Sequence, residues 1–362
     1  MPSCARKDIV PNGEVGVYHC MNRCVRRAWL CGQDPVTGSC YDHRKGWIED
    51  RLEELAGSFA IDVCGFSAMS NHVHIVLRTR PDVVDTWSDE EVALRWWRLF
   101  PKRRDEEGRP AEPEPQELQM LTGDEAVLAE RRRRFADLSW FMRCLSEPIS
   151  RRANAEDHVT GRFWEGRFRC QRLLDEAAIL ACSVYVDLNP IRAGIAQTPE
   201  ESDYTSVQQR IEARVTEVAQ IAGSSRRKGE AETAGADGAV REPDGWLCPV
   251  GVEGDGPAKA ERNRHRRASN KGYLPLGFED YLRIVDWTGR QVRSDKRGSI
   301  PCELLPILDR VGLRSQSWVD CVQNFGRWFH RAAGRVSLLA GAAAQAGRRW
   351  FHGVSRCRQA FA

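Results

Sequence analysis

The order of helix and strand patterns in the sequence predicts the α+β class, with a mainly helical region toward the C-terminus. Residues 72–78 alternate polar and β-branched side chains, which is typical of a strand with one buried face. An alternating segment, an amphipathic helix and a second strand precede it. The order strand, helix, strand, strand begins a ferredoxin-like sandwich, which has an antiparallel sheet with helices on one face. We expect the other face to carry the ligand.

The elements before residue 80 are predicted from periodicity. Residues 16–24 alternate well enough for a first strand. Residues 43–56 repeat apolar side chains at three- and four-residue steps, so we expect an amphipathic helix that Gly57 ends. Residues 59–66 form the second predicted strand. The short link at 67–71 favours a hairpin between this strand and residues 72–78.

Two histidines stand one residue apart in the strand at 72–78. Successive side chains of a strand point to opposite faces, so His72 and His74 lie on the same face. Paired imidazoles suit a divalent metal ion. A hydrogen-bonded histidine pair in a core is the alternative, and residues 69–78 alone do not decide between the two.

The middle of the chain predicts helices and one insertion. Residues 89–100 favour a tryptophan-rich helix, and residues 137–155 a long helix that Pro148 kinks. Between them, residues 101–117 are charged and rich in proline, so we expect a mobile insertion. The four-arginine run at 131–134 favours a solvated helix face.

Basic and aromatic residues alternate in residues 160–172. This segment contains four arginines and a single acidic residue, Glu165, so its local charge is about +3. The arginines are Arg162, Arg167, Arg169 and Arg172. Aromatic side chains, Trp164 among them, lie between the arginines. Such a mixture suits phosphate contacts together with stacking of unpaired bases. An edge strand with outward-facing arginines is the alternative.

A capped helix and a polar motif follow. Asp175 is predicted to cap a helix that reaches Tyr185. Tyr185 and Asn189 are four residues apart, so they share a helix face if the helix extends to Asn189. Pro190 opposes such an extension, because the residue before a proline disfavours the α region. A single helical tyrosine is more often a core or boundary residue.

Taken together, four segments resemble the IS200-like transposases, in particular the branch associated with repetitive extragenic palindromes. The matching residues are 18–19 with 22–23, 69–74, 161–168 and 185–194. Their order and separation agree with the family across residues 14–212. The insertion at 101–117 and everything after residue 212 depart from its compact members.

The resemblance implies a ferredoxin-like domain that cleaves and rejoins single-stranded, hairpin-bearing DNA. In that family pattern Tyr185 is the nucleophile and forms a 5′-phosphotyrosine intermediate. His72 and His74 bind a divalent metal, Mg²⁺ or Mn²⁺, and Asn189 stands where the family has a third polar ligand. Arg192 lies in the last matching segment, and we count it with Trp164 and the four arginines above as a DNA contact.

Two alternatives stay open. One is a domesticated DNA-binding protein with little or no catalysis. The other is a metal-dependent single-strand nuclease, and a replication-initiation or plasmid-relaxation nuclease fits residues 185–194 poorly. The sequence does not decide between a monomer and a homodimer.

Composition narrows the protein class. The net charge of the 362 residues is only +3, so a nucleic-acid surface must come from local clustering. Thirteen scattered cysteines predict reduced thiols. We find no signal peptide and no apolar run long enough for a membrane span, and expect a soluble, cytoplasmic, nucleoid-associated protein.

The C-terminal part predicts a linker and a helical region. Residues 213–272 read as a flexible charged linker. Residues 273–362 carry three helical patterns, at 278–287, 304–313 and 318–329. They fit a small DNA-binding module or an appendage packed on the catalytic domain.

Overall fold

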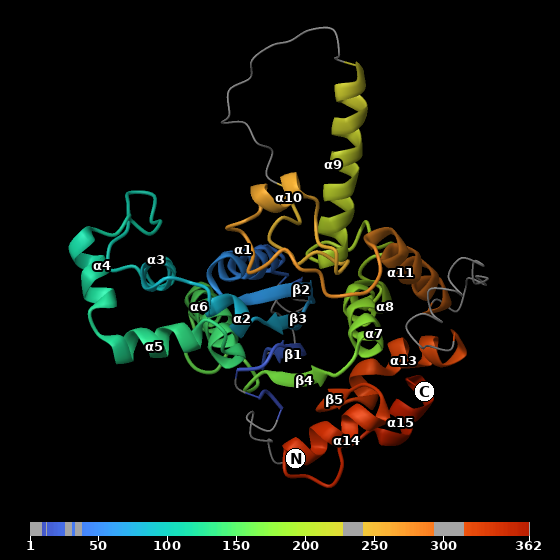
Figure 1. Cartoon of the computed structure of the whole chain (residues 1–362). Coiled ribbons are helices and arrows are strands. Elements are labelled where there is room, and N and C mark those ends of the chain that lie inside the picture. The colour runs from blue at the N-terminus through green and yellow to red at the C-terminus, as the bar shows by residue number, and fades with distance from the viewer. Residues whose placement is uncertain are drawn as a thin grey trace.

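The computed structural model describes residues 9–11, 13–25, 31–32, 38–226, 242–292 and 315–361. Its architecture is α+β, with a five-stranded mixed sheet at the centre and helices around it (Figure 1). The strands are β1 (Gly16–Arg23), β2 (Ile61–Ala68), β3 (His72–Thr79), β4 (Arg169–Leu173) and β5 (Ala332–Ala333).

The strand order across the sheet is β2-β3-β1-β4-β5. The first four strands pair antiparallel with their neighbours, whereas β4 and β5 are parallel. The register sets His19 opposite Val76 and Tyr18 opposite Leu77. Because β1 and β3 are inner strands, their side chains lie at the middle of the sheet.

One face of the sheet packs against α1 (His43–Ser58) and α6 (Leu138–Glu156). Tyr18, Ile75 and Leu77 point to this face and are fully buried. Four helices lie between β3 and α6 in sequence, and α4 and α5 extend away from the sheet in Figure 1. They are α2 (Pro81–Val84), α3 (Asp89–Leu99), α4 (Pro115–Thr122) and α5 (Glu125–Arg134).

The opposite face is covered by α7 (Glu176–Asp187), and α13 (Ser315–Trp328) packs on α7. We expected this face to carry the ligand, and the structure adds an apolar layer of α7 and α13 over part of it. Val17, Val76 and Leu173 alternate onto it and are buried in the core that α7 and α13 complete. These apolar side chains must be shielded from water by other apolar groups, whereas the polar residues of the same face need no such shielding.

The remaining helices are α8 (Asn189–Arg192), α9 (Ser206–Arg226), α10 (Pro257–Arg262), α11 (Phe278–Val292), α14 (Val336–Gln345) and α15 (Val354–Ala360). Of these, α8 and α11 lie beside α7, α14 and α15 lie near the C-terminal end, α10 lies above α1, and α9 extends away from the sheet (Figure 1). In the described part of the chain no helix is long and apolar enough to cross a membrane.

Most predicted elements are present, with shifted ends. The helix predicted at 43–56 continues through Gly57 to Ser58, and the strand predicted at 59–66 is two residues late, as β2. A glycine is needed at position 57 because the backbone of a distant loop packs on it: a Cβ there would lie 3.0 Å from the His265 carbonyl oxygen. The predicted helix at 304–313 lies outside the described residues.

Two segments differ from the sequence prediction. The expected mobile insertion at 101–117 overlaps α4, whose first turn Glu114 and Glu117 cap reciprocally. The expected linker at 213–272 is not one unstructured segment either. Helix α9 continues to Arg226, and the stretch after residue 241 packs on the sheet, where Arg78 donates a hydrogen bond to the Gly272 carbonyl.

Candidate functional site

The two histidines of β3 lie side by side on the sheet face that α7 covers. Their ring centroids are 4.7 Å apart, with the ring planes nearly perpendicular. His74 is buried and His72 partly so. Burial lowers the pKa of His72 to about 4 and that of His74 well below its usual value. Both imidazoles are therefore neutral at pH 7, which is the form that binds a metal ion.

A third histidine, His19 of β1, completes the cluster. Its Nε2 lies 2.8 Å from His74 Nδ1, and its Nδ1 lies 3.4 Å from Gln171 Oε1. Burial lowers the pKa of His19 to about 4, so it is neutral as well. If Gln171 accepts from His19 Nδ1–H, then His19 Nε2 accepts from His74 Nδ1–H. This chain leaves a lone pair on His74 Nε2.

His72 has a matching arrangement at its own ring. Its Nδ1 lies 2.6 Å from the Asn71 side-chain oxygen, which has no proton to donate. His72 Nδ1 therefore carries the proton, and its Nε2 keeps a lone pair. Hydrogen bonds of this kind fix the tautomer of histidines that bind metals.

Tyr185 lies over this cluster on the last turns of α7. The helix begins where Asp175 accepts a hydrogen bond from the Ala178 amide, as the sequence predicts. The Tyr185 ring centroid is 5.5 Å from that of His74 and 5.9 Å from that of His19. Burial raises the pKa of Tyr185, while the Arg192 guanidinium, 5.1 Å from its ring centroid, acts to lower it.

Asn189 is next to Tyr185, although the helix does not run through it. Helix α7 ends at Asp187, and Asn189 begins the short α8 with Pro190 at its start. The Asn189 side chain nevertheless lies close enough to Tyr185 to oppose the rise in the pKa of the phenol that burial causes. Its amide nitrogen is buried without a hydrogen-bond partner among the described residues.

His72 and His74 supply two neutral imidazoles on one sheet face, and paired imidazoles suit a divalent metal ion. In the residues that the structure describes, no group of three His, Cys, Asp or Glu side chains is arranged to hold a metal. Any metal at His72 and His74 must therefore complete its shell with an amide oxygen, water or substrate. A neutral ligand set of this kind leaves the full charge of the ion for the substrate.

Side chains from the C-terminal region close the site. The Phe325 ring of α13 is 5.8 Å from the Tyr185 ring, and an added Cβ at Gly326 would lie 2.9 Å from the Tyr185 hydroxyl. Arg192 donates a hydrogen bond to the Gln323 carbonyl. A cavity of about 450 Å³ remains beside Tyr185, His19 and His74.

The arginines predicted to contact DNA differ in their exposure, in the face of the sheet on which they lie and in their ion pairs. Arg162, Arg167, Arg169 and Arg192 are exposed, and Arg169 and Arg192 line the cavity beside Tyr185. Arg172 alternates to the opposite face of β4, where it pairs with Glu14 at 3.1 Å. Whether these arginines bind DNA stays a prediction.

Trp164 requires a correction. Its side chain is 9% exposed, and its indole nitrogen donates to the Ser146 carbonyl at 2.9 Å. Phe163 beside it is buried too. The alternation that we took for stacking aromatics instead supplies core side chains to the layer of α1 and α6.

Three contributors were missed by sequence reasoning. His19 could have been found, because alternation in β1 and pairing with β3 together place it beside His74. Gln171 follows by the same argument from β4. Phe325 has no local signal, because only the packing of α13 on α7 brings it to Tyr185.

Comparisons with known proteins add little to this geometry. No protein-family model and no curated protein matches the chain. One solved structure, described as "Structure of the REP associates tyrosine transposase bound to a REP hairpin", covers 67% of this chain and 96% of its own at 11% identity. Its TM-score is 0.33. At that level the function has to be argued from the residues of this chain.

Proposed function

We propose that this protein is a DNA transposase of the IS200-like type, which cleaves and rejoins single-stranded, hairpin-bearing DNA through Tyr185. The observation that carries the proposal is that Tyr185 lies over the sheet face of His72 and His74, with the Tyr185 and His74 ring centroids 5.5 Å apart. Three of the four segments that resemble the family, far apart in sequence, contribute to this one site. The antiparallel order β2-β3-β1-β4 supports a ferredoxin-like catalytic domain over residues 14–212.

The reaction is a transesterification in which the bonds balance. The Tyr185 oxygen forms a bond to a backbone phosphorus and the bond from phosphorus to the 3′ oxygen breaks. The phenol proton is lost, and the leaving 3′ oxygen takes up a proton to become a hydroxyl. The resulting 5′-phosphotyrosine keeps the energy of the ester, so a second 3′-hydroxyl can reverse the step and be joined.

The tyrosine must lose its proton to attack. An ordinary phenol has a pKa near 10, so ionising it at pH 7 costs about 4 kcal/mol. Burial of Tyr185 adds to this cost, while the Arg192 guanidinium and Asn189 offset part of it. The same arginine lines the cavity beside Tyr185, which suits it to contact with a phosphate there.

We propose His72, His74 and Asn189 as the holders of a Mg²⁺ or Mn²⁺ ion. Bound there, the ion would supply positive charge against a non-bridging phosphate oxygen. The hydrogen bonds of His72 to Asn71 and of His74 to His19 support the role, since both orient an Nε2 lone pair. A DNA-acting enzyme of this kind works in the cytoplasm beside the nucleoid.

One observation favours the alternative of a DNA-binding protein without catalysis. Phe325 and Gly326 of α13 pack against Tyr185 and narrow the access of a phosphate to its hydroxyl. In a protein that does not cleave DNA, this packing against Tyr185 would have no functional cost. In an active enzyme, a phosphate would enter through the cavity that remains beside Tyr185.

The experiment is incubation of the full chain with a labelled pool of DNA hairpins carrying single-stranded tails, with Mn²⁺ or with EDTA. We expect a DNA–protein adduct that survives denaturation and forms with Mn²⁺ only. Hairpin binding without an adduct would favour the non-catalytic alternative. Cleaved DNA without an adduct would mean that water attacks and that the protein is a metal-dependent nuclease.

A further inference from the structure

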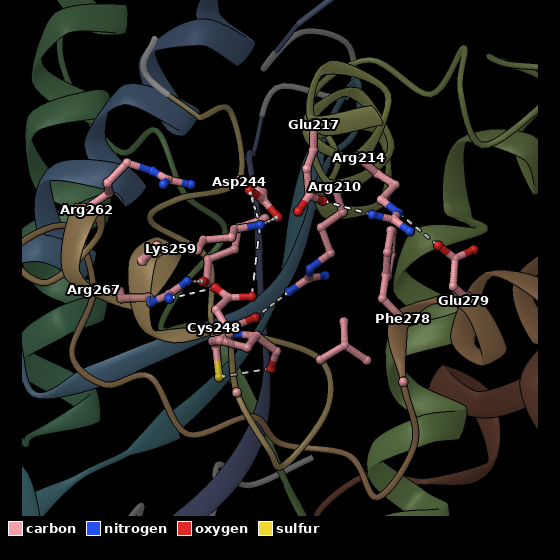
Figure 2. A pocket seen from close by; sticks show the side chains of 18 of the residues that line it. Arg210, Arg214, Glu217, Asp244, Cys248, Lys259, Arg262, Arg267, Phe278 and Glu279 are labelled. Carbon is pink, nitrogen blue, oxygen red and sulfur yellow. Dashed lines mark hydrogen bonds and ion pairs between the residues drawn. The ribbon is translucent and has the colours of Figure 1, made fainter. Parts of the chain in front are cut away.

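The cavities of the described structure differ in whether acidic side chains neutralise the basic side chains that line them. Figure 2 shows a cavity of about 710 Å³ rich in arginine and lysine. Arg210 donates to backbone carbonyls. The other basic side chains pair with carboxylates, as in the hydrogen bond of Arg214 to Glu279 at 2.9 Å and the pair of Lys259 with Asp244 at 3.3 Å. Such a cavity presents little net positive charge, so it does not favour an anionic polymer.

The C-terminal region carries a groove of different character. The cavity beside Tyr185 shares Asn324 and Arg327 with a second hollow of about 910 Å³, which lies between α13 and the start of α15. Among the described residues that line the two hollows there is no aspartate or glutamate. We call this pair of hollows the C-terminal groove. Its arginines are Arg169, Arg192, Arg327 and Arg356.

Aromatic side chains line the far end of this groove. Trp350 is 66% exposed, which is unusual for so large an apolar side chain. Trp328 lies near it along the lining, and the Arg356 guanidinium is 4.9 Å from the Trp328 ring centroid. Exposed aromatic rings beside arginines are the platform on which unpaired bases stack.

The groove also has a defined inner end. Helix α13 carries Arg327 and Trp328 on the turn after Phe325, which touches Tyr185. Because the two hollows share Asn324 and Arg327, a DNA strand that enters at Trp350 and follows the arginines would arrive at the proposed nucleophile. Duplex DNA keeps its bases stacked inside the helix, whereas a single strand can place a base on Trp350.

We propose that the C-terminal groove binds single-stranded DNA and leads it to Tyr185. The proposal rests on the proposed function and extends it to residues outside the segments that resemble the family. Arg327 contacts a backbone phosphate where the two hollows meet, and Trp350 stacks on a base at the entrance. The C-terminal region is thus part of the DNA-binding surface and also packs on the catalytic domain.

The test uses the full chain and a fluorescein-labelled oligo(dT) of about ten nucleotides, because stacking platforms bind without sequence preference. Fluorescence anisotropy measures the affinity of wild-type protein, Trp350→Ala and Arg327→Gln. We expect each variant to bind about tenfold more weakly. The salt dependence of Arg327→Gln should fall by about 0.7 in slope, as for one lost phosphate contact.

Matched controls change similar side chains elsewhere. Met120→Ala removes an apolar side chain of α4 that is 72% exposed, and Arg143→Gln removes an arginine of α6 on the other side of the sheet. Both should bind oligo(dT) within about twofold of wild type. Thermal unfolding of all four variants checks that the fold is kept.

The outcomes separate this proposal from the proposed function. Loss of oligo(dT) affinity in Trp350→Ala and Arg327→Gln supports the groove even if no adduct forms at Tyr185. Unchanged affinity in both variants overturns the groove even if wild type forms the adduct. Wild-type protein that does not bind oligo(dT), or that binds oligo(U) RNA more tightly, overturns it as well.

Discussion

Tyr185 is held between opposing influences. Its burial under Phe325 raises the pKa of the phenol, and the neighbouring Arg192 acts in the other direction. Tyr18, the other tyrosine near the histidine strand, does not share this environment. It points to the opposite face of the sheet, is fully buried, and its pKa is raised by burial. Tyr185 is therefore the tyrosine that can meet a substrate at the histidine face.

The tautomers of the histidine cluster lead to a prediction for His19. His19→Ala removes the ring whose Nε2 lies 2.8 Å from His74 Nδ1, so His74 loses the group that orients its Nε2. We expect Mn²⁺ affinity to fall by about 10- to 100-fold, while hairpin binding stays near wild type. Isothermal titration with Mn²⁺ and anisotropy with a hairpin measure the two quantities.

The control is His43→Ala, which removes a partly exposed histidine of α1 that pairs with Glu156. It should leave Mn²⁺ affinity unchanged. Equal Mn²⁺ affinity of His19→Ala and wild type would show that His19 is a packing residue.

Single residues were predictable where strand alternation decides their side. His72 and His74 fall together on one face because they are two residues apart in β3. Trp164 was misread because its burial depends on α6, which the local pattern does not contain. Phe325 belongs to α13, whose contact with α7 is set by tertiary packing. No local sequence pattern therefore predicts that Phe325 reaches Tyr185.

Strand β4 makes a prediction at the level of an element. Its alternation puts Arg169 on the face of His19 and Arg172 on the other, where Arg172 pairs with Glu14. Arg169→Gln should weaken DNA binding and reduce its salt slope by about 0.7 for single-stranded DNA. Arg172→Gln should leave the slope unchanged. The measurement is DNA affinity by fluorescence anisotropy at several salt concentrations for the two variants. Equal salt slopes would contradict this difference between Arg169 and Arg172.

Helix α7 is fixed by the buried carboxylate of Asp187, two residues after Tyr185. Asp187 accepts hydrogen bonds from Ser206 at 2.6 Å and from Tyr281 of α11 at 2.5 Å. Tyr281→Phe removes one donor and leaves part of the buried carboxylate unsatisfied. We expect a loss of about 1–3 kcal/mol in the free energy of unfolding, measured by urea denaturation.

Tyr273→Phe is a matched control in the same region. The Tyr273 hydroxyl is buried without a hydrogen-bond partner among the described residues, so removing it should be nearly neutral. Equal losses in the two variants would mean that the hydrogen bond to Asp187 contributes nothing to the anchoring of α7.

The charge of the whole molecule is distributed unevenly. The net charge of +3 indicates no DNA surface, yet the groove near Tyr185 is lined by arginines while the hollow between α1 and α9 is lined by acids. Sequence analysis predicted local clustering and placed it in residues 160–172. It did not predict Arg327 or Arg356, because the linear pattern around them is ordinary.

The acidic hollow gives a pH dependence of stability through Glu49. Burial raises the pKa of Glu49 from 4.5 to about 7. The acidic neighbours Asp50, Glu53 and Glu212 act in the same direction, and Gln209 acts against them. Asp203, Glu242 and Arg266 also line the hollow. A raised folded pKa stabilises the fold below about pH 4.5, and this contribution is lost as the pH rises through about 7.

We therefore expect Glu49→Gln to remove part of the loss of stability between pH 5 and pH 8. Because Glu49 is partly exposed, the effect is about 1 kcal/mol after allowance for solvent screening. Urea denaturation at both pH values measures it. Glu261→Gln, at a side chain that is 75% exposed, is the control. The same pH dependence in wild type and Glu49→Gln would rule out this origin.

The central claim is that Tyr185 is the nucleophile of a DNA-cleaving site built on the histidine face. The most direct measurement is mass spectrometry of the peptide that carries the DNA after incubation with hairpin substrates and Mn²⁺, in wild type and Tyr185→Phe. The account predicts a nucleotide adduct on Tyr185 in wild type and none in Tyr185→Phe, which should still bind hairpins because only one oxygen is lost. An adduct on another residue, or one that persists in Tyr185→Phe, would contradict it.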